Sequence, residues 1–92
     1  MDADTLKMIM KLNGNFFTLK SRHKGDDGCK VYIADAKEIQ GTIYVAYVYY
    51  SDDLNDSDYY WIGKFEEGKV IATYQAILEN RWSNLEKFEF KF

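Results

Sequence analysis

Apolar and polar residues alternate along the first twenty residues of the chain. Residues 6–12 alternate with a period of two except at Ile9, and residues 15–21 follow after an Asn-Gly pair. Asn-Gly between two alternating segments is a strong hairpin signal, because a type I′ turn needs positive φ at both central residues. The pattern predicts an N-terminal β-hairpin formed by residues 6–12 and 15–21, with one apolar and one mostly basic face.

Short segments rich in β-branched and aromatic residues dominate the middle of the chain. They predict strands over residues 29–34, 42–50 and 58–65, and a turn at 66–69 that leads into a strand at 70–72. Both faces of the 42–50 segment are largely apolar, so we expect this strand to be central in a sheet or to lie at an interface.

The period changes towards the C-terminus. Apolar residues of segment 73–82 follow helical spacing at Tyr74, Ile77, Leu78 and Trp82. Residues 86–92 alternate strictly again and predict a strand. An aspartate followed three residues later by a glutamate predicts a single capped helical turn at 35–38. Together these elements predict an α+β fold: an antiparallel sheet of about six strands with one principal helix near 73–82.

Composition supports a single folded domain over residues 1–92. Apolar residues make up 47% and aromatic residues 17% of the chain, which is typical of a globule with a core. Cys29 is the only cysteine, so no disulfide can form within the chain. The N-terminus lacks the pattern of a signal peptide, and no apolar stretch approaches the roughly 20 residues of a membrane span. We therefore expect a cytoplasmic protein that does not enter a membrane.

Charge divides the chain into unlike parts. Residues 25–68 hold ten of the fifteen carboxylates against three lysines, together with seven of the eight tyrosines. Residues 1–24 hold five cations against two carboxylates. A polarised, acidic and aromatic surface predicts a basic partner protein. The net charge of −3 disfavours direct binding of nucleic acid, which depends largely on neutralising phosphates.

Residues that carry enzyme or metal chemistry are scarce. His23 and Cys29 are the only residues of their kinds, and no motif supports a catalytic pair. A calcium loop starting at Asp53 fails, because Asp58 stands where glycine is needed and Lys64 where glutamate is needed. We expect a protein that is not an enzyme and holds no cofactor or metal.

Carboxylates near the aromatic strands give the most specific hypothesis. Side chains two residues apart on a strand are separated by about 6.6 Å, and DNA presents one phosphate per ~3.4 Å along each strand. Exposed carboxylates on strands and turns can therefore imitate a phosphate track. The predicted partner-binding residues are Asp52, Asp53, Asp56, Asp58, Tyr59, Trp61, Glu66 and Glu67.

These residues, with Tyr60, make the chain resemble small acidic phage-encoded inhibitors of host defence, of the anti-restriction and DNA-mimic type. The resemblance is one of composition over the whole chain. It implies an inhibitor that acts in the host cytosol by occupying the phosphate-binding groove of a nucleic-acid-processing protein. The basic N-terminal part departs from the pattern and favours a homodimer that aligns two acidic faces, with residues 42–50 as its interface.

Two other functions stay open on the sequence. One is a small RNA- or single-strand-binding module that combines sheet aromatics with the basic residues Lys20, Arg22, His23 and Lys24. The other is an antitoxin or immunity-type partner protein, which would use the same acidic face on a different target.

Overall fold

The computed structural model describes residues 1–50, 59–73 and 78–79. Helix α1 (Ala3–Asn13) comes first in the chain. Six strands follow: β1 (Phe16–Lys20), β2 (Lys30–Ile39), β3 (Thr42–Tyr49), β4 (Tyr59–Glu66), β5 (Lys69–Ala72) and the short β6 (Leu78–Glu79).

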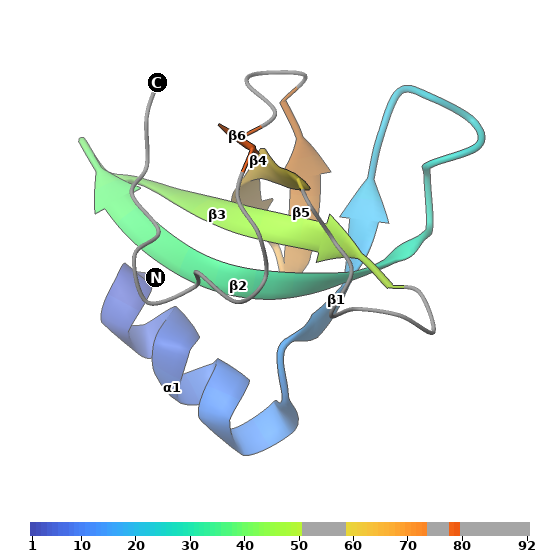
Figure 1. The fold of residues 1–92 in the computed structure, drawn as a ribbon. Helices are drawn as coiled ribbons and strands as arrows, with labels where there is room; N and C mark the ends of the chain where they lie inside the picture. The colour runs from blue at the N-terminus through green and yellow to red at the C-terminus, as the bar shows by residue number, and fades with distance from the viewer. Residues whose placement is uncertain (51–58, 74–77, 80–92) are drawn as a thin grey trace.

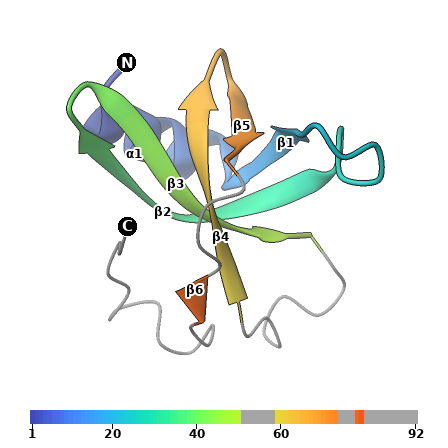
Figure 2. The same cartoon turned by 90° about the horizontal axis from the view of Figure 1, so that it is seen from above.

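The first five strands close into a small barrel (Figures 1 and 2). Neighbours from β1 to β5 are antiparallel, and β3 pairs with both β2 and β4. Strand β5 then pairs in parallel with β1. The predicted open sheet is therefore wrong. In a five-stranded meander the first and last strands run in the same direction, so the barrel can close only through a parallel pair.

The predicted N-terminal hairpin is also wrong, because its first arm is α1. Asp2 caps this helix: its carboxylate accepts a hydrogen bond of 2.8 Å from the backbone N–H of Thr5. Leu6 and Met10, four residues apart, are buried against the barrel. Ile9, the residue that interrupts the alternation, continues the same helical face and is half-buried.

The Asn-Gly pair ends the helix instead of forming a hairpin turn. Gly14 has φ of 85°, the positive value that commonly follows a helix C-terminus. The predicted helix near 73–82 lies largely outside the described residues. Of its described residues, Thr73 is not helical, and Leu78–Glu79 is a strand paired with β4. The predicted strand at 86–92 lies outside the described residues altogether.

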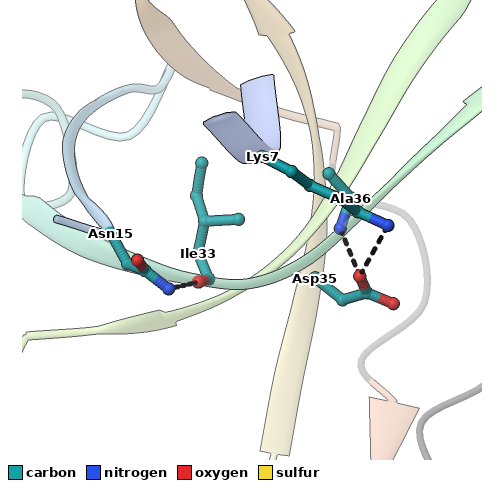
Figure 3. A network of polar contacts seen from close by, with 5 residues as sticks. All are labelled: Lys7, Asn15, Ile33, Asp35 and Ala36. Atoms are coloured by element: carbon teal, nitrogen blue, oxygen red, sulfur yellow. Dashed lines mark hydrogen bonds and ion pairs between the residues drawn. The ribbon is translucent and has the colours of Figure 1, made fainter. Parts of the chain in front are cut away.

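Strand β2 is longer than predicted and runs through the segment expected to form a helical turn. The pairing of β2 with β3 shifts between Ile33 and Asp35, which marks a bulge. The Asp35 carboxylate accepts a hydrogen bond from the backbone N–H of Ala36 (2.9 Å) and lies 3.7 Å from Lys7 Nζ on α1 (Figure 3). The Asn15 side chain donates to the Ile33 carbonyl (2.9 Å), so polar contacts on both sides of the bulge fasten the start of the chain to β2.

The strands expected in the middle of the chain are confirmed, and so is the turn between β4 and β5. Glu67 and Gly68 both have positive φ, 51° and 76°, as a two-residue type I′ turn requires. Strand β3 is central, with hydrogen-bonded partners on both edges and buried residues on both faces. The expectation that this strand is central in a sheet is therefore confirmed, and its role as a dimer interface stays a prediction.

Inward-pointing side chains fill the barrel and meet α1. The core cluster contains Leu6, Met10, Leu19, Val31, Ile33, Ala36, Ile43, Val45, Tyr47, Phe65 and Val70. Gly63 on β4 has no room for a side chain. A Cβ there would lie 2.8 Å from the Ile71 carbonyl oxygen and 3.0 Å from the Tyr47 ring. Glycine therefore allows β3, β4 and β5 to approach one another closely where the barrel bends.

Candidate binding surfaces at the aromatic end of the barrel

The alternating strand directions give the barrel two unlike ends. The helix end contains α1 and the turns at 39–42 and 66–69, since Met1 lines one groove together with Gly41 and Glu67. The aromatic end contains the close of β3, the start of β4 and the 21–29 loop that joins β1 to β2. Figure 1 shows α1 beneath β2 and this loop at the opposite corner of the molecule.

Three aromatic side chains gather at the aromatic end. Tyr47 and Trp61 are paired across β3 and β4, and their rings are stacked with centroids 6.4 Å apart. Tyr49 meets Trp61 edge to face at 4.9 Å and Tyr47 at 5.9 Å. Tyr47 is only 2% exposed, whereas Tyr49 and Trp61 are half-buried. The cluster thus has a buried base and two accessible walls.

The 21–29 loop is organised by its own backbone. The carbonyl of His23 accepts hydrogen bonds from the N–H groups of Asp26 and Asp27, each 3.0 Å long. The Asp27 carboxylate accepts from the N–H of Ser21 (2.9 Å), and the Cys29 thiol donates to the Gly25 carbonyl (3.5 Å). These bonds fix the loop as a defined rim beside the aromatic cluster.

Rim and cluster together line a partly open cavity of about 220 Å³. Its lining contains Ser21, His23, Asp26, Tyr47, Tyr49, Trp61, Ile62 and Ala72. A groove of about 380 Å³ adjoins it and shares Ser21 and Ala72 with the cavity. The groove is lined by Lys20, Ser21, Arg22, Glu66, Ile71, Ala72 and Thr73. An aromatic compartment therefore lies next to one that carries cations.

A second aromatic group lies on the outer surface of β1, β2 and the end of β3. The Phe16 ring meets Tyr32 at 5.2 Å and Tyr50 at 5.3 Å, both edge to face. Phe16 is 37% and Tyr50 49% exposed. The Lys30 ammonium lies 4.8 Å from the centroid of the Phe16 ring and 5.1 Å from that of Tyr50, within cation–π distance. We call Phe16, Lys30, Tyr32 and Tyr50 the aromatic platform.

The predicted partner-binding residues are separated by the fold. Glu66 and Glu67 are exposed at the far end of β4, roughly 16 Å from Trp61 at about 3.3 Å per strand residue. Glu66 also lines the groove that adjoins the aromatic cavity, together with Lys20 and Arg22. Trp61 lies at the aromatic end, and Tyr59 opens β4 beside it. Four of the predicted residues, Asp52, Asp53, Asp56 and Asp58, lie outside the described residues. The described residues therefore separate Glu66 and Glu67 from Trp61 along β4, and the surface predicted for the four aspartates stays a prediction.

The two long segments that the structure describes are close to neutral in charge. Segments 1–50 and 59–73 together carry nine cations and eight carboxylates. Segment 51–58 carries four carboxylates and no cation, and residues 74–92 carry three of each sign. The negative charge of the chain thus resides in one eight-residue segment, which begins directly after Tyr50 of the aromatic platform.

Sequence reasoning missed the aromatic platform because the register of the strands was unknown. Phe16 pairs with Tyr32, and the Tyr50 N–H bonds to the Lys30 carbonyl, which brings residues from three strands together. The alternation of residues on β1 was visible in the sequence. The alternation predicts a hairpin with residues 6–12, whereas β1 in the structure pairs with β2 and β5.

Burial raises the pKa of Tyr60 on β4 to about 12, with a smaller contribution from the neighbouring Tyr32. Tyr60 is fully buried, so its hydroxyl is held in the neutral form. Among the residues that the structure describes, no group of three or more His, Cys, Asp or Glu side chains is arranged to hold a metal ion.

Comparison with known protein families, with curated proteins and with solved structures found no match. Within the described ranges, no helix has the length and apolar character needed to cross a lipid bilayer.

Proposed function

We propose that this protein binds a basic, nucleic-acid-processing protein and blocks its nucleic-acid site, without catalysing a reaction itself. The aromatic platform provides apolar contact area, and the four aspartates of segment 51–58 provide negative charge that attracts a basic partner. The proposal places the protein in the cytosol of the cell whose nucleic-acid machinery it inhibits. An antitoxin or immunity function would use the same surfaces and differ only in the target.

The observation that carries this proposal is the aromatic platform itself. Exposed Tyr and Phe side chains are enriched at the centres of protein interfaces, where they give much buried area at low entropic cost. Phe16 and Tyr50 together with Tyr32 form such a group on a rigid sheet surface. The rings already accept one ammonium, that of Lys30, so arginine or lysine of a basic partner matches them chemically.

The acidic segment supports the choice of a basic partner. In the sequence it follows Tyr50 of the aromatic platform and precedes Tyr59, the first residue of β4. Its four carboxylates are unopposed by any cation in the segment. Such a charge raises the association rate with a cationic groove and excludes nucleic acid from the same region.

The test is affinity capture from nuclease-treated host cytosol with four forms of the protein. We expect a basic nucleic-acid-handling protein to bind the wild type. Changing Phe16 and Tyr50 to Ala should weaken capture by at least about 10-fold, the effect of a single interface hot spot. Changing the four aspartates of segment 51–58 to Asn should weaken capture and flatten its salt dependence. Leu12→Ala, at an exposed apolar residue of the helix, is the matched control and should bind normally.

Capture that is equal for all four forms would refute the proposal. The single-strand-binding function would be favoured instead if proteins were captured only from cytosol without nuclease treatment and the protein bound an oligonucleotide directly at low salt. In that case removing the aspartates should strengthen binding, because carboxylates repel phosphates.

A further inference from the structure

We propose that the cavity at the aromatic end binds a nucleotide, either free or as one unit of a single strand. The base occupies the 220 Å³ cavity beside Tyr49 and Trp61, and the phosphate lies in the adjoining groove near Lys20 and Arg22. This site is separate from the aromatic platform, since Tyr49 and Tyr50 point to opposite faces of the sheet. It does not depend on the function proposed above.

The size and walls of the cavity fit a planar ring. A cavity of about 150 Å³ is enough to hold benzene, so about 220 Å³ accommodates a nucleobase. Tyr49 and Trp61 stand nearly perpendicular to each other, with an interplanar angle of 84°. A base can therefore stack on one ring and meet the edge of the other, and base–aromatic stacking is the usual source of affinity at such sites.

Polar groups stand at the rim, where the hydrogen-bonding edges of a base or sugar would lie. Asp26, Ser21 and His23 all line the cavity. Asp27 bonds to the loop backbone, whereas the described part of the chain gives the Asp26 carboxylate no hydrogen bond or ion pair. The Asp26 carboxylate is therefore available to accept from an amino group of a base or from a ribose hydroxyl, a charge-assisted bond.

The charged residues that line the adjoining groove are two cations, Lys20 and Arg22, and one carboxylate, Glu66. Lys20 and Arg22 lie at the end of β1 and the start of the loop, and both line the groove. Ser21, between them in sequence, lines groove and cavity alike. A ligand that crosses at Ser21 would place an apolar ring on one side and an anion on the other, which is the arrangement of a nucleotide.

The experiment titrates the full-length protein with the four ribonucleoside 5′-monophosphates, the matching nucleosides and a short single-stranded oligonucleotide, followed by NMR chemical shifts. We expect saturable shifts of the Trp61 indole N–H and of the 21–29 amides. The monophosphate should bind more tightly than its nucleoside, and only this difference should shrink at high salt. If the oligonucleotide binds more tightly than the monophosphates, the ligand is one unit of a strand. If the affinities are equal, the ligand is a free nucleotide.

Variants separate the two halves of the site. Asp26→Ala should weaken both nucleoside and nucleotide by about 10-fold, the usual effect of losing a hydrogen bond to a charged group. Arg22→Gln should weaken only the nucleotide, and Lys37→Gln, an exposed lysine on β2 that lines neither compartment, is the charge-matched control. Tyr49→Ala should remove binding, and its fold is checked by the dispersion of the amide spectrum.

The proposal is overturned if no nucleotide or nucleoside gives saturable shifts at millimolar concentration. It is also overturned if Asp26→Ala and Arg22→Gln both bind as the wild type does, because binding would then lie elsewhere. Phe16→Ala should leave nucleotide binding intact. Failure of this site therefore says nothing against the aromatic platform, and failure of the platform says nothing against this site.

Discussion

The two ends of the barrel are built from different kinds of residue. At the helix end, Leu6 and Met10 of α1 close the core with aliphatic side chains. At the aromatic end, no helix covers the described strands; Tyr49 and Trp61 remain half-buried beside a hydrogen-bonded loop and a cavity. The contrast separates the aliphatic packing of the core at one end from the proposed nucleotide site at the other.

The largest effect is expected from removing a buried side chain at the helix end of the barrel. Leu6 is fully buried, so Leu6→Ala should lower the free energy of unfolding by about 2–5 kcal/mol through lost burial and a new cavity. Urea unfolding followed by circular dichroism measures the change. Leu12→Ala, on the same helix but 78% exposed, is the control and should change stability by less than about 0.5 kcal/mol. Equal effects of the two substitutions would show that α1 does not close the core.

The next largest effect is expected where the two ends meet. Gly63→Ala forces a Cβ against the Ile71 carbonyl and should cost about 1–3 kcal/mol, because backbone must shift to make room. The same shift should move the Tyr47 ring and change the NMR signals of the aromatic end. Gly25→Ala is the matched control, since a Cβ there meets nothing within 4 Å. A Gly63→Ala protein of unchanged stability would mean that the barrel tolerates a wider spacing of these strands.

Alkaline titration examines the side of the barrel that carries Tyr60. Its folded-state pKa of about 12 lies above the ordinary value of 10.0, so the folded protein holds the phenolic proton more tightly. The associated stability is complete below pH 10 and should fall as pH rises towards 12, by less than about 2.7 kcal/mol for two pKa units. Tyr60→Phe should remove this part of the slope in urea unfolding. An identical slope in both proteins would contradict the assignment.

Acid titration examines the helix end and should give the smallest effect. The backbone N–H of Thr5 donates to the Asp2 carboxylate and lowers the pKa of that group below its ordinary value of 3.8. The stabilisation is present above pH 3.8 and should be lost as pH falls through the lowered pKa. Asp2→Asn still caps the helix but cannot titrate, so the difference between the two proteins in helical signal isolates the cap. If the helical signals of the two proteins did not differ down to pH 2, Asp2 would not contribute to the loss of stability at acid pH.

The strands in the middle of the chain could be predicted because the sequence patterns that specify them are local. The apolar strand at 42–50 and the two-residue turn before β5 depend on side chains and φ angles within a few residues. The N-terminal segment could not be predicted, because its apolar residues fit both the period of a strand and the period of a helix. Its alternation suited a strand, and only the Asp2 cap and Ile9 indicated the helix. Closure of the sheet depends on Gly63 and on the pairing of β1 with β5, neither of which leaves a local pattern.

The candidate sites were less predictable than the strands. Trp61 was expected at an acidic binding surface and lies at the aromatic end, next to Tyr47 and the 21–29 loop. Only the alternative of a single-strand-binding module combined sheet aromatics with residues of this loop. Glu66 and Glu67 were grouped with Trp61 and lie at the other end of β4. Sequence proximity gives the strand to which a residue belongs, whereas a site depends on which strand ends meet, and this is fixed by the barrel.

The parallel pair that closes the barrel has a consequence for the order of folding. Leu19 and Val70 pair although about fifty residues separate them in the chain, whereas every other barrel pair joins consecutive strands. Closing so long a loop costs more entropy than forming a hairpin, so this pairing should form last. The β1–β5 junction would then be the first to open under native conditions, with early hydrogen exchange at Lys20 and Ile71. The same junction borders the groove lined by Lys20, Arg22 and Glu66. A ligand bound in this groove would therefore stabilise the strand pairing that forms last.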